Sequence, residues 1–143
     1  MLLDLCSLSS ENTVALDSRL QHFLDSELVI EDGAWLLPDL RRGANTEMSS
    51  DFGTRTEFEC YVNKFFINDF VRETTINLVR KCTLRFALAL KGKLANYGRF
   101  NVIVSFQDDN CTVRFHLIRV DENWLLPDLD GYKEESLLVL STE

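Results

Sequence analysis

The stretch RFNVIVSFQDDNCTVRFHLIRV, residues 99–120, decides the fold class. Apolar side chains take every second position over residues 100–106 and again over residues 113–117. Successive side chains of a strand point to opposite faces, so this alternation predicts two half-buried strands. The polar run at 108–110 between them is a turn signal, and together the two patterns predict a β-hairpin.

The chain before this hairpin predicts two helices. Apolar side chains recur every three or four residues over 71–96, and Tyr97-Gly98 then supplies a stop signal. A shorter run with similar spacing, residues 10–25, predicts a second helix that Ser10 or Asn12 caps. Each pattern turns one apolar stripe of a helix toward a core.

Shorter segments predict the remaining strands. Residues 27–30 and 34–37 flank Asp32-Gly33, which is a hairpin-type turn signal. Residues 55–62 alternate between apolar and polar side chains and predict a half-buried strand. Residues 135–140 predict the last strand of the chain.

These elements predict one α+β domain. The polar stretch 41–53 has two glycines and no periodicity, and it predicts a loop. No linker rich in Pro, Gly or Ser divides the chain, so we expect a single domain over residues 1–143. Hairpin strands separated by helices are typical of an α+β domain, in which an antiparallel β-sheet is packed against helices.

The six residues WLLPDL occur twice, at 35–40 and at 124–129. Pro fixes its own backbone and moves the preceding Leu out of helical geometry. Each copy therefore predicts a turn with an aromatic anchor at the end of a strand. We expect the two copies to follow similar backbone paths.

The net charge of −8 is unevenly placed along the chain. Residues 1–40 hold eight acidic and one basic side chains, residues 41–100 hold six and eleven, and residues 101–143 hold nine and three. Phosphate binding needs a dominant positive surface, so we expect no nucleic-acid partner. A basic protein is a better match, although an acidic surface also serves solubility alone.

The N-terminal residues predict the compartment. They contain no basic segment of the kind that begins a secretion signal, and no apolar run in the chain is long enough to span a bilayer. We therefore expect a cytoplasmic protein with no membrane partner. The four cysteines, at 6, 60, 82 and 111, lie far apart in sequence and are expected to be free, buried thiols.

No motif predicts a metal site or a cofactor. The two histidines, His22 and His116, have no Cys or His at metal-ligand spacing. Cys111 and His116 lie five residues apart on one predicted strand, so they face opposite sides. Cys60 or Cys82 paired with His116 leaves a cysteine-dependent enzyme as an alternative, while core packing explains the same thiols.

The acidic C-terminal third predicts the partner-binding surface. It places aromatic anchors within an acidic rim, a composition that suits recognition of a basic protein. In the alternative interpretation the tryptophan belongs to the core and the acids keep the surface soluble. The expected partner-binding residues are Asp108, Asp109, Asp121, Glu122, Trp124, Asp128, Asp130, Tyr132 and Glu134.

The segment ENWLLPDLDGYKEESLLVL, residues 122–140, follows the predicted strand that contains Phe115-His116. It resembles the C-terminal part of bacterial immunity proteins of contact-dependent growth inhibition and related polymorphic toxin systems, and residues 58–70 show a second similarity. The resemblance implies a small cytoplasmic protein that binds a cognate toxin domain, often a nuclease, and occludes its active site. It carries over no interface residue, because such surfaces diverge with their toxins.

We therefore expect a non-enzymatic inhibitor that binds a basic toxin domain through an acidic face. The first alternative is an acidic adaptor subunit with no toxin partner. The second is an enzyme that uses Cys60 or Cys82. The sequence indicates no oligomeric state.

Overall fold

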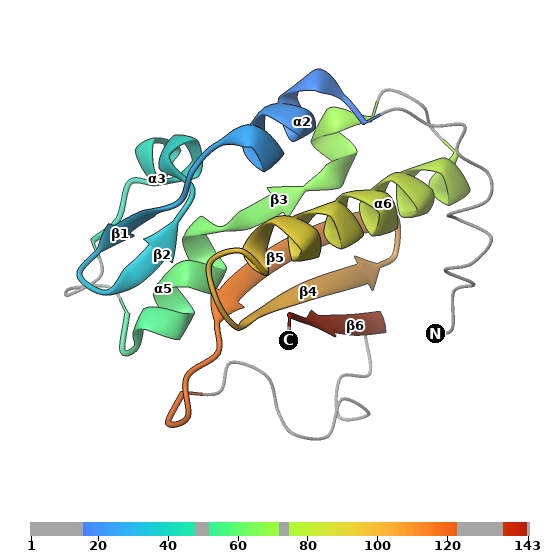
Figure 1. Cartoon of the computed structure of the whole chain (residues 1–143). Helices are drawn as coiled ribbons and strands as arrows, with labels where there is room; N and C mark the ends of the chain where they lie inside the picture. Colours follow the sequence, from blue (N-terminus) through green and yellow to red (C-terminus); the bar gives the residue numbers. More distant parts are fainter. Residues whose placement is uncertain (1–15, 48–51, 72–74, 123–135, 143) are drawn as a thin grey trace.

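The computed structural model describes residues 16–47, 52–71, 75–122 and 136–142, and it has the expected α+β architecture (Figure 1). A four-stranded antiparallel sheet, in the order β3-β5-β4-β6, carries the long helix α6 on one face, and β1 and β2 form a separate two-stranded sheet. The described elements, in chain order, are α2 (Ser18–Asp25), β1 (Val29–Glu31), β2 (Ala34–Leu36), α3 (Pro38–Gly43), α5 (Arg55–Val62), β3 (Lys64–Phe66), the 3-10 helix η1 (Ile67–Phe70), α6 (Ile76–Leu94), β4 (Phe100–Gln107), β5 (Asn110–Leu117) and β6 (Ser136–Ser141).

The predicted central hairpin is confirmed as β4 and β5, but β4 is buried on both faces and not on one, since Ile103 and Ser105 are only 1% and 7% exposed. The two strands pair from Phe100 with Leu117 to Gln107 with Asn110, and Asp108 turns the chain with a positive φ of 53°. Alternate side chains of both strands face α6 and are buried with its apolar stripe. Each fully buried Phe or Leu of this core contributes about 1.5–3 kcal/mol.

The main predicted helix is confirmed as α6, and Thr142, which follows β6, joins the chain just after this helix to the start of β4. Gly98, with φ 151°, lets the chain leave the helix toward β4. The Thr142 hydroxyl donates to the Gly98 carbonyl at 2.7 Å and accepts from the Phe100 N–H at 2.8 Å. The last predicted strand is also confirmed, as β6, which pairs with β4.

The prediction of a strand at 55–62 is wrong, because these residues form the helix α5. Thr54 caps the helix by accepting from the Glu57 N–H at 3.1 Å, and the Glu57 carboxylate accepts from the Gly53 N–H at 3.1 Å. Thr54-x-x-Glu57 is thus a helix-start signal of the capping-box type, which competes with the alternation of apolar residues. Glu59, one of the polar residues of this segment, is buried in the helix.

The N-terminal half otherwise follows the predictions in part. The helix expected at 10–25 is confirmed over α2, whose cap is Asp17, while the expected caps at Ser10 and Asn12 lie outside the described residues. The β1–β2 hairpin is confirmed, with Asp32 and Gly33 at φ 51° and 83°. The loop expected at 41–53 is wrong for 41–43, which belong to α3, while 44–47 form no helix or strand.

The first WLLPDL copy ends a strand and starts a helix. Trp35 and Leu36 belong to β2, Leu37 is extended with φ −81° and ψ 126°, and Pro38 is the first residue of α3. Pro suits that position because the first turn of a helix leaves its N–H groups unpaired. The second copy, at 124–129, lies outside the described residues.

Candidate functional site

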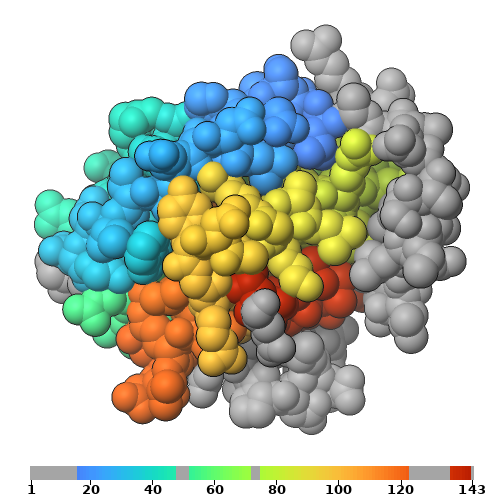
Figure 2. Space-filling model, in the orientation of Figure 1, coloured from blue at the N-terminus to red at the C-terminus, as the bar shows by residue number. Residues whose placement is uncertain are grey.

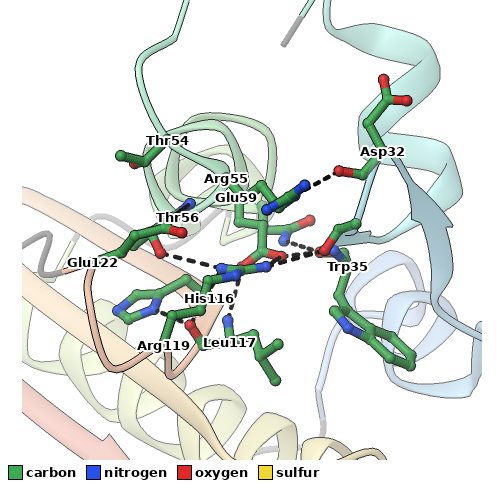
Figure 3. Close-up of polar contacts among 12 residues, drawn as sticks. Asp32, Trp35, Thr54, Arg55, Thr56, Glu59, His116, Leu117, Arg119 and Glu122 are labelled. Atoms are coloured by element: carbon green, nitrogen blue, oxygen red, sulfur yellow. Dashed lines mark hydrogen bonds and ion pairs between the residues drawn. The ribbon is translucent and has the colours of Figure 1, made fainter. Parts of the chain in front are cut away.

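A fully buried carboxylate, Glu59, lies at the centre of a polar network (Figure 3). Its Oε1 accepts from the Leu117 N–H at 2.8 Å, and its Oε2 accepts from the Trp35 N–H at 2.6 Å. A carboxylate removed from water is stable only where its oxygens are hydrogen-bonded and its charge is balanced. The two backbone N–H groups meet the first of these needs.

Arg119 supplies the balancing charge. Its Nη1 donates to Glu59 Oε1 at 2.9 Å and its Nη2 donates to Glu59 Oε2 at 2.6 Å, a bidentate pair (Figure 3). The same guanidinium donates to the Gly33 carbonyl at 3.2 Å and to the Thr56 hydroxyl at 3.1 Å. It therefore joins the β1–β2 turn, α5 and the chain that follows β5.

Asn63, at the end of α5, extends the network to β2. Its Nδ2 donates to the Trp35 carbonyl at 2.8 Å, and its Oδ1 accepts from the Leu37 N–H at 3.2 Å. The Asn63 carbonyl accepts from the Phe115 N–H at 3.2 Å. These bonds fix α5 between β2 and β5, so the network positions the opposite, outer side of α5.

That outer side forms one wall of a groove of about 650 Å³ between α3, α5 and the edge strand β3. We call it the aromatic groove. Tyr61 and Phe66 are 57% and 50% exposed there, although large aromatic side chains are usually more deeply buried. The Phe52 ring packs against Phe58 and Tyr61 with centroid distances of 5.4 and 5.2 Å. The described residues that line the groove are Asp39, Leu40, Gly43, Ala44, Phe52, Glu57, Tyr61, Val62, Lys64, Phe66 and Arg114.

The charged residues of the aromatic groove are divided by sign between its walls. Lys64 and Arg114 are direct partners in the β3–β5 register, and the Lys64 ammonium lies 4.6 Å from the centroid of the Phe66 ring. On the helical walls, Asp39 pairs with His22 at 2.7 Å and with Arg42, while Glu57 caps its own helix. The sheet wall is therefore basic and the helical walls are acidic.

The described acidic residues of the predicted partner-binding surface do not lie together on one face. Asp108 and Asp109 are exposed at the β4–β5 turn, and Asp121 is exposed beyond the far end of β5. These places lie at opposite ends of the hairpin in Figure 1, separated by at least the length of the strand, about 25 Å for eight residues. Segment 118–122 (orange) protrudes at the lower edge of the face in Figure 2.

Glu122 has a role within the fold. Its Oε1 accepts from the Thr56 N–H at 3.0 Å, at the N-terminus of α5. Burial raises the pKa of Glu122, but the bonds from Thr56 and the nearby Arg119 outweigh this effect and hold that pKa below its usual value. The remaining predicted residues, Trp124, Asp128, Asp130, Tyr132 and Glu134, lie outside the described residues.

The three described cysteines are free and buried, as expected, and Cys6 lies outside the described residues. Burial raises the pKa of the Cys60 thiol to about 12, although the Arg114 guanidinium opposes this. Burial also raises the pKa values of Cys82 and Cys111. Burial lowers the pKa of His116, because the interior disfavours the charged imidazolium.

Two observations concern other kinds of site. Within residues 16–47, 52–71, 75–122 and 136–142, no three His, Cys, Asp or Glu side chains are placed to hold a metal ion together. Among the helices of these same residues, none has the length and apolar character needed to cross a membrane.

Sequence reasoning missed the aromatic groove because it placed residues 55–62 in a strand. A signal was present in the density of aromatic residues: Phe58, Tyr61, Phe65 and Phe66 fall within nine positions. In a helix followed by a short strand, two of these enter the core and two remain outside. The site therefore depends on the local fold more than on composition.

Comparison with known proteins identifies a family. The family model described as "Uncharacterized protein PM0498 family" matches residues 1–143. No curated protein and no solved structure matches the chain.

Proposed function

We propose that this chain, which belongs to the Uncharacterized protein PM0498 family, is a cytoplasmic inhibitor that binds a partner protein through the aromatic groove. Its function is not enzymatic. The observation that carries this proposal is the pair of half-exposed rings, Tyr61 and Phe66, in one concave site. Aromatic anchors in a concave, water-excluding site are the usual centre of a protein interface.

The groove is suited to a partner because its walls are held rigidly. The Glu59–Arg119 pair and Asn63 fix the inner side of α5. The backbone that carries Tyr61 on the outer side therefore loses little conformational entropy when a partner binds. Phe66 belongs to β3, which pairs with β5 on one side and forms the edge of the sheet. Exposed aromatic side chains on rigid elements are typical of a binding site.

The partner we propose is a toxin domain, such as a nuclease, that acts in the cytoplasm. Support comes from the resemblance of residues 122–140 to immunity proteins and from the net charge of −8, which favours association with a basic domain. Asp108, Asp109 and Asp121 are exposed at separate places. They are suited to steer a basic partner from a distance, while the groove makes the close contact.

The enzyme alternative is less well supported. The thiolate is the reactive form of cysteine, and a thiol with a pKa of about 12, such as Cys60, is almost wholly protonated at neutral pH. In the alternative of an acidic adaptor subunit, the same groove binds a partner protein that is not a toxin and is not inhibited. An inhibition assay separates it from the proposed function.

The proposed function is tested with a toxin domain taken from the gene beside this one. The wild-type chain is titrated into the domain while toxin activity and binding are measured. The double variant Tyr61→Ala, Phe66→Ala should bind at least about 30-fold more weakly, because an aromatic anchor at an interface centre contributes about 2 kcal/mol or more. Ile30→Ala is the matched control, since Ile30 is 59% exposed on β1.

Two results would count against the proposal. Equal inhibition by the wild type and the double variant would move the interface away from the groove. Binding without inhibition would support the adaptor instead.

A further inference from the structure

We infer that β6 is an interface at which two copies of this chain pair edge to edge, so that their four-stranded sheets join into one. β6 is the last strand in the order β3-β5-β4-β6, and Figure 1 shows it at the border of the sheet beside β4. The inference goes beyond the proposed function and does not depend on it, because no described residue of β6 lines the aromatic groove.

The hydrogen-bond register directs the backbone groups of three β6 residues away from the sheet. The Thr142 N–H donates to the Phe100 carbonyl at 2.9 Å, so these two residues form a hydrogen-bonded pair at the end of the β4–β6 ladder. In an antiparallel ladder such pairs alternate with pairs whose N–H and C=O groups point outward. The outward groups of β6 therefore belong to Leu137, Val139 and Ser141. Within the described residues, no hydrogen bond engages these groups.

This edge lacks the features that usually keep a sheet from pairing with another chain. Natural edge strands are often short, or they contain a proline, a bulge or a charged side chain. β6 has six residues, its sequence SLLVLS contains no proline and no charge, and its register with β4 is unbroken. The opposite edge strand, β3, has only three residues and includes Lys64. The contrast identifies β6 as the edge suited to pairing.

The apolar side chains of β6 are incompletely buried on both faces of the sheet. Leu138 and Leu140 pack against the buried core on the α6 side. Leu137 and Val139 lie on the opposite face, because side chains alternate along a strand. All four remain partly exposed, so a strand added beside β6 removes further apolar surface from water.

A second copy of β6 matches this edge in register and in charge. Two identical antiparallel strands are related by a twofold axis perpendicular to the sheet, so each contact occurs twice. With Val139 on the axis, Val139 pairs with its own counterpart and Leu137 pairs with Ser141 of the second copy. This register engages all the outward N–H and C=O groups of both strands. Since the strand contains no charged side chain, no like charges meet within the pair.

The first test is sedimentation equilibrium of the full chain over about a hundredfold range of concentration, at low and at high salt. We expect a reversible monomer–dimer equilibrium. Each copy has a net charge of −8, so the copies repel at long range and added salt should strengthen the dimer. Binding to a basic partner has the opposite dependence on salt, which separates this association from the proposed function.

Variants place the interface on the strand. Val139→Lys should weaken dimerisation at least about 30-fold, because two like charges then meet at the twofold axis. Val29→Lys is the matched control and should leave dimerisation unchanged, since Val29 is an exposed valine of β1, outside this sheet. Circular dichroism reports whether each variant is folded, and Leu137→Lys replaces Val139→Lys if that variant does not fold.

Amide hydrogen exchange gives a second, independent measurement on the unmodified chain. The outward N–H groups of Leu137, Val139 and Ser141 should exchange slowly at high concentration and faster on dilution. A monomer at every concentration would overturn the inference. Slow exchange in that monomer would show that another part of the same chain covers the edge, and fast exchange would show an edge that stays open. A dimer that the folded lysine variant leaves intact would place the interface elsewhere and overturn the inference as well.

Discussion

Replacing Arg119 by alanine tests how much the buried Glu59–Arg119 ion pair stabilises the fold that carries the candidate site. The Arg119 side chain is 13% exposed and that of Glu59 is 0% exposed, so the substitution leaves a carboxylate in the interior without its counter-charge. Removing one member of a buried ion pair costs about 3–5 kcal/mol. The Trp35 and Leu117 N–H groups still bind Glu59, so we expect the lower part of that range, about 3 kcal/mol.

The measurement is urea unfolding of the wild type and of Arg119→Ala, followed by circular dichroism. The matched control is Arg41→Ala. Arg41 also pairs with a glutamate, Glu31, at 2.9 Å, but the two side chains are 22% and 38% exposed. Such a partly exposed pair contributes about 0–1 kcal/mol. The reasoning is that burial makes the Glu59–Arg119 pair contribute more to the free energy of unfolding than the partly exposed Glu31–Arg41 pair. Equal losses of stability in the two variants, or a loss below about 1 kcal/mol for Arg119→Ala, would refute it.

Three further predictions concern single residues. Gly92→Ala should stabilise the chain by about 0.5–1 kcal/mol in the same unfolding assay, because Gly92 lies in a helix and an added Cβ meets open space. Gly98→Ala should destabilise the chain, because the backbone there has a φ of 151°. A change of the same sign in both variants would contradict this prediction. Burial lowers the folded-state pKa of His116, so the unfolded chain binds the extra proton and stability falls as pH drops below about 6.5. His116→Gln should reduce that slope by up to about 1.4 kcal/mol per pH unit, and an unchanged slope would assign the acid sensitivity to other groups. Cys60, whose pKa burial raises to about 12, should react with a thiol reagent only after unfolding, and rapid native reaction would restore the enzyme alternative.

The hairpin and the long helix were predictable because a single pattern dominates each. Residues 100–106 alternate without a competing helical stripe, and the structure pairs them as β4. Over 76–94 the apolar spacing is helical throughout, and Gly98 marks the exit. In both segments one pattern sets the type of element, so periodicity is sufficient for that, although it does not predict that β4 is buried on both faces.

Residues 55–62 were mispredicted because two patterns coincide there. Phe58, Cys60 and Val62 alternate as in a strand, but Thr54 and Glu57 cap a helix. In a segment of eight residues the cap decides, since it satisfies N–H groups that a helix start leaves unpaired. Periodicity measured over so few positions does not discriminate between the two.

The candidate site was less accessible to sequence reasoning than the fold. The predicted acidic residues lie close together in sequence, yet in space Asp108 and Asp121 are separated by the length of β5. Tyr61, Phe66 and Arg114 come together only because α5 folds back on the sheet beside β3. Long-range placement of this kind is not encoded in the spacing of neighbouring residues.

The most direct test of the central claim is hydroxyl-radical footprinting of the chain alone and in complex with the toxin domain. This measurement reads side-chain exposure residue by residue. If the aromatic groove is the interface, oxidation of Tyr61 and Phe66 should fall markedly in the complex, while Ile30 and Val120, 59% and 96% exposed, remain unchanged. Unchanged oxidation at Tyr61 and Phe66, with protection at another surface, would contradict the account.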